Sequence, residues 1–254
     1  MKARILGSGT SSGVPRLGND WGACDPAEPR NRRTRASLLV EQDGVRVLVD
    51  TSPDMREQLL AADVATVDAV IWTHDHADHL HGIDDLRQVY HALGRPVRGL
   101  ARAETLAVIG RRFGYVFAGR EGYPATVAAQ QLPDRLQIGG LTIRCVDQPH
   151  GSISSVGLRF EGDGKSIGYA TDFHDLTPAM HALYTDLDVW IVDALRHAPH
   201  PTHPTVASVL DWVRELRPRQ TALIHMDNSM DYRTEAETLP AGVEPGYDGQ
   251  EFMP

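Results

Sequence analysis

The pattern of apolar and polar positions predicts alternating strands and helices without an internal repeat. Helices are indicated where apolar residues recur every three or four positions, and strands by short apolar or alternating runs bounded by turn residues. Strands are expected at residues 3–6, 36–41, 45–50, 69–72, 141–147, 155–161, 166–170, 188–193 and 220–225. Helices are expected from Pro53 to about Ala62 and at residues 83–93, 103–113 and 205–217. This succession favours mixed sheets with outer helices.

Three stretches lack this regular pattern. Little periodicity appears between the glycine-rich run Gly7-Ser8-Gly9-Thr10-Ser11-Ser12-Gly13-Val14-Pro15 and Ala36. Such a long loop in a compact domain is usually functional or disordered. Residues 119–125 are rich in glycine and proline and predict a surface loop, and residues 234–254 predict an irregular tail.

Composition narrows the class of protein. The 254 residues are 41% hydrophobic and 23% charged, which excludes disordered and fibrous chains. No apolar run approaches the ~18 residues of a membrane span, and glycines interrupt the start before a signal peptide can form, so we expect a cytoplasmic protein. With 25 Lys+Arg against 34 Asp+Glu the net charge is −9, which disfavours broad binding of nucleic acid. Two cysteines exclude a disulfide framework.

The chemical signal lies in the twelve histidines. Thr73-His74-Asp75-His76-Ala77-Asp78-His79 directly follows a predicted buried strand. Three imidazoles and a carboxylate this close together cannot share one face of a helix or strand, so the segment predicts a loop with mixed nitrogen and oxygen donors for two divalent ions. Further donors follow other predicted strands, namely His150, Asp172 and His225. We expect all of them to converge on one edge of the sheets.

These donors resemble the full ligand set of the metallo-β-lactamase superfamily, whose α/β (α+β) fold is a four-layer αβ/βα sandwich. The glycine-rich run and three further motifs resemble the branch that contains the phosphoribosyl cyclic phosphodiesterase. The three motifs are Asn31-Arg32-Arg33, Asp50-Thr51-Ser52-Pro53-Asp54 and Gly82-Ile83-Asp84-Asp85-Leu86-Arg87. The resemblance covers residues 4 to 233. It implies hydrolysis of a small or cyclic phosphodiester by metal-activated hydroxide.

The resemblance also assigns roles to the ligands. It implies one metal held by His74, His76 and His150, a second held by Asp78, His79 and His225, and Asp172 as the bridge between them. The two ions are Zn²⁺, Mn²⁺ or Fe²⁺, since the mixed donor set suits all three. Asp78 is also expected to hold or relay a proton of the attacking water. Because one centre gathers ligands from His74 to His225, we expect a single domain over residues 1–254.

Two further groups are candidate substrate contacts. The segment Pro199-His200-Pro201-Thr202-His203 matches the His-x-Thr pattern of the phosphodiesterase branch. It predicts His200 as a general acid or oxyanion stabiliser and His203 as a substrate or supporting contact. Arginine suits phosphate binding, so Arg33 is a candidate substrate contact. It belongs to a basic cluster with Arg30, Arg32 and Arg35, for which a structural role is the alternative.

One departure from the branch bears on metal content. In that branch a Cys-x-Cys-x-x-Cys run and a later histidine hold a separate structural zinc. Alignment on Cys24 places Asn19, Trp21 and Asn228 at the other three positions. One thiolate and two amides do not make a tetrahedral zinc site. We therefore expect no third, structural zinc.

Other functions share this ligand set. A tRNA 3′-end endoribonuclease has the same ligands and a His-x-Thr element, but this chain lacks a basic arm that would grip RNA. Thiolester or lactone hydrolysis needs no proton donor at His200. A non-hydrolytic accessory protein of pyrroloquinoline quinone synthesis is suggested by Ser52-Pro53-Asp54-Met55-Arg56, although its histidine loop is degenerate. The natural substrate, the native metal and the oligomeric state, including a homodimer, stay open at this level.

Overall fold

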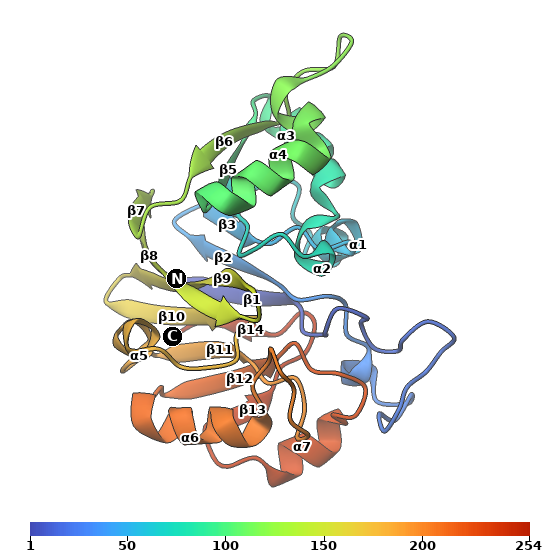
Figure 1. The fold of residues 1–254 in the computed structure, drawn as a ribbon, viewed down its shortest axis with the longest axis vertical. Helices are drawn as coiled ribbons and strands as arrows, with labels where there is room; N and C mark the ends of the chain where they lie inside the picture. The colour runs from blue at the N-terminus through green and yellow to red at the C-terminus, as the bar shows by residue number, and fades with distance from the viewer.

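The computed structural model describes residues 1–254 as two seven-stranded β-sheets that pack face to face, with helices on both outer sides (Figure 1). The sheets form the two inner layers and the helices the two outer ones. The four-layer αβ/βα sandwich expected from the sequence is confirmed. No helix combines the length and apolar character needed to cross a bilayer.

The first sheet and its helices come mainly from the first half of the chain. Its strands, in sheet order, are β14 (Glu251–Phe252), β1 (Lys2–Gly7), β2 (Ser37–Gln42), β3 (Val45–Val49), β4 (Ala69–Ile71), β5 (Val97–Ala101) and β6 (Val127–Gln131). The helices of this half are α1 (Met55–Ala61), α2 (Ala77–Leu80), α3 (Leu86–Leu93) and α4 (Ala103–Ala118), with the 3₁₀ turns η1 (Pro29–Asn31) and η2 (Ile83–Asp85).

The second sheet comes from the second half. Its strands, in sheet order, are β13 (Val243–Pro245), β12 (Gln220–Ile224), β11 (Val189–Asp193), β10 (Lys165–Ala170), β9 (Ile153–Gly162), β8 (Leu141–His150) and β7 (Arg135–Ile138). The helices of this half are α5 (Pro178–Tyr184), α6 (Val206–Leu216) and α7 (Tyr232–Thr238).

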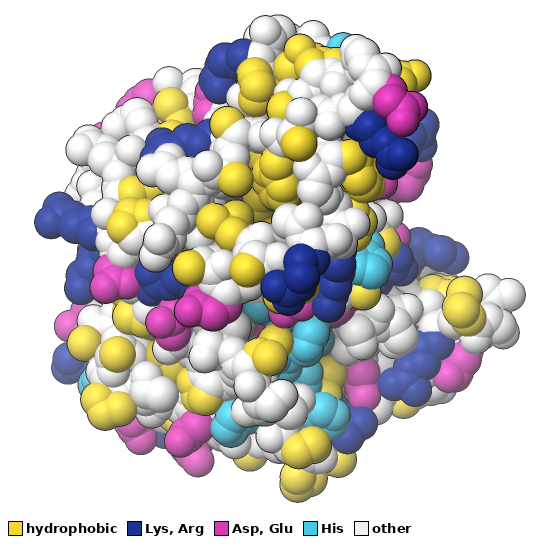
Figure 2. Space-filling view, turned by 45° about the horizontal axis from the view of Figure 1, so that its top comes forward, with side chains coloured by type: hydrophobic (Ala, Val, Ile, Leu, Met, Phe, Trp, Pro, Cys, Tyr) yellow, Lys and Arg dark blue, Asp and Glu magenta, His cyan; other side chains and the backbone are white.

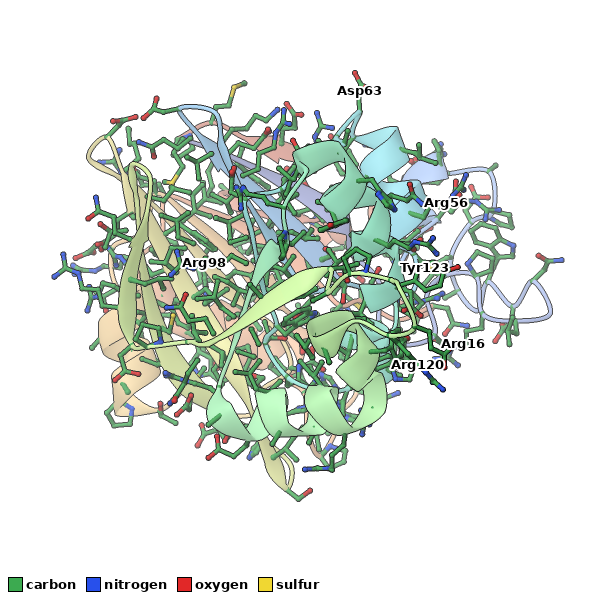
Figure 3. The ribbon with its side chains drawn as sticks, turned by 90° about the horizontal axis from the view of Figure 1, so that it is seen from above. Arg16, Arg56, Asp63, Arg98, Arg120 and Tyr123 are labelled. Carbon is green, nitrogen blue, oxygen red and sulfur yellow. The ribbon has the colours of Figure 1, made fainter.

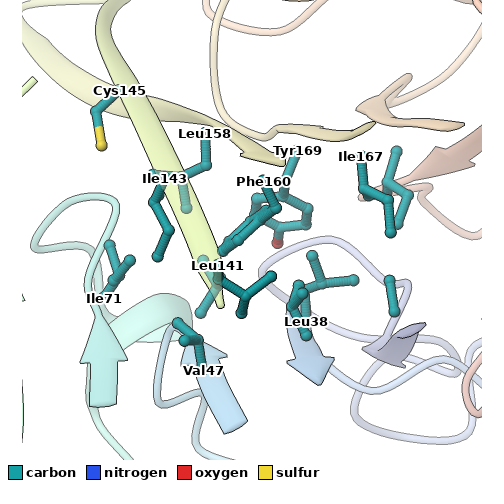
Figure 4. Packing of buried hydrophobic residues seen from close by; sticks show 14 of the residues in the cluster. Leu38, Val47, Ile71, Leu141, Ile143, Cys145, Leu158, Phe160, Ile167 and Tyr169 are labelled. Carbon is teal, nitrogen blue, oxygen red and sulfur yellow. The ribbon is translucent and has the colours of Figure 1, made fainter. Parts of the chain in front are cut away.

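The main core fills the space between the sheets. Leu38 and Val47 of the first sheet pack with Ile143 and Phe160 of the second (Figure 4). Side chains on the opposite faces of the same strands pack against the helices, as Trp190 does beside α5. Because central strands are buried on both faces, they appear in the sequence as continuous apolar runs.

Strand direction brings the candidate ligands to one edge. β3, β4 and β5 are parallel neighbours, as are β10, β11 and β12, so the carboxyl ends of each set point the same way. β8 is antiparallel to β9, and β9 is antiparallel to β10, so β8 also runs with β10. Residues that follow β4, β10 and β12, and the last residue of β8, therefore meet at the same edge of the sandwich.

Most predicted elements are confirmed, with shifted ends. β8 continues to His150, α4 continues to Ala118, and the predicted helix 83–93 begins as the 3₁₀ turn η2. The irregular tail expected over residues 234–254 is wrong. It contains most of α7 and two edge strands, β13 on β12 and β14 on β1. Strands of two or three residues carry no visible periodicity, because sheet pairing rather than local pattern forms them.

The tail also fastens the long N-terminal loop. One oxygen of Asp248 accepts hydrogen bonds from the backbone N–H and hydroxyl of Ser8, both at 2.8 Å. Its other oxygen accepts from the N–H of Thr34 at 2.7 Å and from its hydroxyl at 2.6 Å. One carboxylate therefore holds both ends of the loop that begins after β1.

Replacing Asp248 by Ala should lower the free energy of unfolding by about 3 kcal/mol, because it leaves four donors without their acceptor. Urea unfolding followed by circular dichroism measures the change. Glu237→Ala, an exposed glutamate on α7 with no hydrogen-bond partner, is the control and should shift stability by less than about 0.5 kcal/mol. Equal effects of the two changes would contradict the role given to Asp248.

Candidate metal centre

The histidine-rich segment crosses from a strand end into a short helix. His74 lies in extended chain after β4, His76 is the residue before α2, and Asp78 and His79 lie within α2. This change of backbone conformation points neighbouring side chains to different places. Gly82 then lets the chain pass close to the loop after β3, since a Cβ there would lie 2.0 Å from the Ser52 carbonyl oxygen.

The seven predicted ligands come together as two groups that share one carboxylate. The ligand atoms of His74, His76, His150 and Asp172 lie within 4.8 Å of one another, as do those of Asp78, His79 and His225, and those of Asp172, His225 and the neighbouring His203. Asp172 Oδ1 lies 3.5 Å from His150 Nε2 and 3.9 Å from His74 Nε2. Its Oδ2 lies 3.0 Å from His79 Nε2 and 3.6 Å from His225 Nε2. The two oxygens of Asp172 therefore face one group each, which is the geometry of a bridging ligand.

Several donor nitrogens in this cluster lack a hydrogen-bond partner. His74 Nε2, His79 Nε2 and His225 Nε2 are buried without a well-formed hydrogen bond and face only the carboxylates of the cluster. Unsatisfied buried polar atoms are unfavourable and rare in native proteins. Divalent cations would supply the missing interactions, so the residues present fit a metal centre.

The opposite nitrogens are held by the protein. His79 Nδ1 lies 2.7 Å from Asp50 Oδ2, and His150 Nδ1 lies 3.1 Å from the carbonyl oxygen of Thr202. His74 Nδ1 lies 3.0 Å from the hydroxyl of Thr73. Each contact fixes the ring so that Nε2 points to the centre, as second-layer partners of metal ligands commonly do.

Burial and charge set the ionisation of these groups in the metal-free chain. Burial lowers the pKa of His74 well below its ordinary value, so that ring is neutral. Burial alone would also lower the pKa of His225, but the charges of Asp172 and Asp193 outweigh it and raise that pKa to about 9. The surrounding imidazoles hold the pKa of Asp172 well below its usual range despite its burial. An ionised carboxylate among imidazoles suits cation binding.

Three residues at this edge adopt a left-handed backbone. Asp50 has φ of 64° and His225 of 58°, both directly after a strand, and Asp172, the second residue after β10, has φ of 55°. Non-glycine residues rarely take positive φ, and such strain gathers at functional sites. Here it turns each side chain away from its strand and toward the shared centre.

Comparison with known proteins agrees with this geometry. A family model described as "Beta-lactamase superfamily domain" matches residues 45–226. The crystal structure of a new diphosphatase from the PhnP family superposes with a TM-score of 0.90 at 34% identity, covering 99% of this chain and 97% of that one. This chain belongs to the metallo-β-lactamase superfamily.

Two curated relatives of this chain carry different names, and both are longer than the chain. A protein of Porphyromonas gingivalis named octanoyltransferase is 33% identical over 261 residues, which cover all of this chain and 51% of that protein. A ribonuclease Z of Bradyrhizobium diazoefficiens is 31% identical over 147 residues, or 54% of this chain and 47% of that protein. The chain thus spans about half the length of these relatives, so neither name can be transferred to it.

The two histidines of the 199–203 segment lie differently in this metallo-β-lactamase-fold centre. His203 Nδ1 lies 2.7 Å from Asp193 Oδ2, and its Nε2 lies 3.9 Å from Asp172 Oδ1. His200 contacts none of these carboxylates, and its Nδ1 accepts a 3.3 Å hydrogen bond from the backbone N–H of Thr202. The predicted supporting residue therefore lies deeper in the centre than the predicted acid (Figure 2 shows histidines gathered on this face).

The prediction that Arg33 binds substrate is wrong. The side chain is 2% exposed, and its guanidinium donates to the carbonyl oxygens of Met230 at 2.6 Å and Asp227 at 3.2 Å. It also reaches Cys24 Sγ at 3.8 Å. A guanidinium committed to these groups joins the N-terminal loop to the loop after His225 and is not available to a phosphate.

The other arginines of the basic cluster are mostly engaged as well. Arg30 pairs with Glu28 at 2.6 Å, and Arg35 pairs with Asp54 at 3.0 Å. The structural alternative for this cluster therefore applies to Arg30, Arg33 and Arg35. The local sequence shows only that positive charges are close together. The carboxylates and carbonyl oxygens that pair with each arginine are known only from the folded chain.

Hydrogen bonds join the loops that align with the structural-zinc motif. Cys24 Sγ donates to the Met230 carbonyl oxygen at 3.4 Å, and the side-chain amide of Asn228 donates to Asp20 Oδ2 at 3.1 Å. Burial raises the pKa of the Cys24 thiol, which keeps it protonated. The absence of a third zinc stays a prediction.

Sequence reasoning missed two carboxylates of the centre. Asp50, directly after β3, orients His79, and Asp193, at the end of β11, contacts His203 and accepts a 3.1 Å hydrogen bond from the backbone N–H of Asp172. Both are fully buried. The available signal was an aspartate at the carboxyl end of a continuous apolar run, the same position that marked Asp172.

Replacing Arg33 by Met should lower the free energy of unfolding by about 2 kcal/mol, because it leaves two buried carbonyl oxygens without donors. Chemical denaturation measures this loss. Arg32→Met, at the exposed neighbouring position, should change stability by less than about 0.5 kcal/mol. Retained stability with a raised KM for phosphate esters would instead restore Arg33 as a substrate contact.

Proposed function

We propose that this chain is a two-metal hydrolase that cleaves a phosphodiester or diphosphate bond in a small molecule. The observation that carries the proposal is the carboxylate of Asp172, whose two oxygens each face a separate group of imidazoles. The similarity at 34% identity to a PhnP-family diphosphatase supports the same class of substrate. Hydrolysis of phosphate esters is a chemistry that such two-metal centres perform.

The ligand groups assign a place to each cation. His74, His76, His150 and Asp172 would hold one, and Asp78, His79, His225 and Asp172 the other. When bound, two cations lower the pKa of water, orient it and neutralise charge on phosphoryl oxygens. The mixed nitrogen and oxygen set suits Zn²⁺, Mn²⁺ or Fe²⁺.

Two side chains are placed to move protons. Neighbouring imidazoles lower the pKa of Asp78 although burial opposes the shift, so its carboxylate is ionised. It can accept a hydrogen bond from the attacking water and relay the proton that this water loses to solvent. The oxygen of that water bonds to phosphorus while the bond from phosphorus to the leaving oxygen breaks. His203 then gives the leaving oxygen the proton on Nε2, while Asp193 keeps hold of Nδ1.

His203 suits the role of general acid better than His200. Asp193 orients its ring as a buried carboxylate orients a catalytic histidine in other hydrolases. His203 is also followed by Pro204 and Thr205, and the hydroxyl of Thr205 accepts from the N–H of Ser208 to begin α6. His203-Pro204-Thr205 is thus a second His-x-Thr element, fixed in place by a helix start.

The runner-up function is processing of tRNA 3′ ends. The ribonuclease Z relative favours it, and the ligand set is common to both. The net charge of −9 and the lack of a basic arm argue against a grip on RNA. Salt-dependent binding of tRNA together with cleavage would promote this function, whereas a metal-loaded chain inert toward every phosphoester would favour an accessory role.

Metal analysis of the loaded protein should find two equivalents per chain. Asp172→Asn should reduce the content to one equivalent or less, because an amide is a weaker ligand and the variant loses the bridging charge. Circular dichroism controls for folding. Three equivalents in the unaltered chain would show a separate structural site and overturn the prediction that none exists.

Loss of the proton donor should depend on the leaving group. His203→Ala should lower kcat about 10²-fold on a phosphodiester with an alkoxide leaving group, such as a 2′,3′-cyclic nucleotide, while metal content stays unchanged. The loss should be much smaller on bis-p-nitrophenyl phosphate, whose leaving group departs as a stable anion. His200→Ala is the matched control, and the same selective loss in that variant alone would assign the role to His200.

A further inference from the structure

A cavity of about 510 Å³ on the helical side of the first sheet has no role in the mechanism above. It lies between α3, the end of α4 and the loop that follows α4. Its lining contains the aromatic and cationic side chains of Tyr90, Tyr115, Tyr123, Arg87 and Arg120, together with Asp84 and with Glu121, which pairs with Arg120 at 3.3 Å. Cavities of about 300–1,000 Å³ typically hold small molecules.

The cavity adjoins the segment that carries the ligands. Arg112 of α4 contacts that segment through Asp75, with Nη2 at 3.0 Å from Oδ2 and Nη1 donating to the carbonyl oxygen at 2.6 Å. The helix departs from helical backbone angles at Phe113, and Tyr115 then donates a 2.6 Å hydrogen bond to Asp84. Asp84 lies five residues after His79, so the ligand segment continues directly into one wall of the cavity.

The aromatic side chains offer faces for a planar ring. Tyr123 is 63% exposed, and the guanidinium of Arg87 lies 5.0 Å from the centre of its ring. Figure 3 shows Tyr123 and Arg120 on the same side of the molecule, and both line the cavity. Nucleobases stack on tyrosine rings regardless of base identity, and arginine adds a cation–π contribution.

The polar side chains suit the rest of a nucleotide. Arg87 has no carboxylate within ion-pair distance and is exposed, so its charge is available to a phosphate. One oxygen of Asp84 accepts from Tyr115, which leaves the other free to accept from a sugar hydroxyl. Burial and this hydrogen bond raise the pKa of Tyr115 to about 12, so the phenol remains a donor.

We infer that this cavity binds the nucleoside part of a nucleotide-containing substrate while the scissile phosphate lies at the metal centre. The inference rests on the proposed function and narrows it, from small phosphate esters in general to nucleoside diphosphate-linked compounds. The base lies against the tyrosine rings, and Arg87 contacts the phosphate that joins the nucleoside to the scissile one.

Binding to the metal-stripped chain tests the cavity separately from catalysis. In calorimetric titrations AMP should bind about tenfold more tightly than ribose 5-phosphate, and inorganic phosphate should bind more weakly still. Tyr123→Ala should remove the preference for AMP, Tyr123→Phe should keep it, and Arg111→Ala, an exposed change on α4 outside the cavity, should have no effect. Equal affinity for AMP and ribose 5-phosphate, or an unaltered preference in Tyr123→Ala, would overturn the inference.

Kinetics of the metal-loaded enzyme give the second test. In Tyr123→Ala the ratio of kcat/KM for ADP-ribose to kcat/KM for bis-p-nitrophenyl phosphate should fall about tenfold through KM, and Tyr123→Phe should restore it. An unchanged ratio in an active enzyme would reject the cavity as a nucleoside site and leave the proposed function intact. Hydrolysis of neither compound would reject the proposed function, and the titrations would still decide the fate of the cavity.

Discussion

The carboxylate of Asp172 is the contact on which the centre depends. It is the one group whose two oxygens reach both sets of imidazoles, and its own backbone is fixed from two sides. Asp193 accepts from its N–H, and the hydroxyl of Ser155 donates to its carbonyl oxygen at 2.7 Å. These bonds hold an aspartate in a left-handed conformation that few residues adopt. The strands that carry the histidine ligands must therefore end at the same edge of the sandwich as Asp172.

That requirement explains the sandwich. Histidine ligands come from both halves of the chain, and neither sheet alone supplies a complete group. Each half contributes parallel strands whose carboxyl ends face the same edge, and the apolar cluster between the sheets holds the two edges together. The rigidity that the site needs comes from strands buried on both faces, while the polar groups are confined to the strand ends.

Much of this could be predicted from sequence, because strand ends and ligand spacing are local. His74 to His79 follow an apolar run, and His225 and Asp172 follow others, so their convergence required only the correct strand directions. The choice between His200 and His203 could not be made locally. Both begin a His-x-Thr triplet, and only the start of α6 and the buried Asp193 distinguish them. Arg33 failed for the same reason, since its carbonyl partners lie almost two hundred residues away.

The contacts of Asp248 have a consequence for the order in which parts of the protein fold. The loop between Ser8 and Thr34 is pinned at both ends by one side chain that lies more than two hundred residues later. Closing a loop from its two ends costs chain entropy, and here the bonds that offset this cost are made by a residue far away in the sequence. The segment between Ser8 and Thr34 therefore acquires its final position only when the strand-edge segment that carries Asp248 has joined the fold.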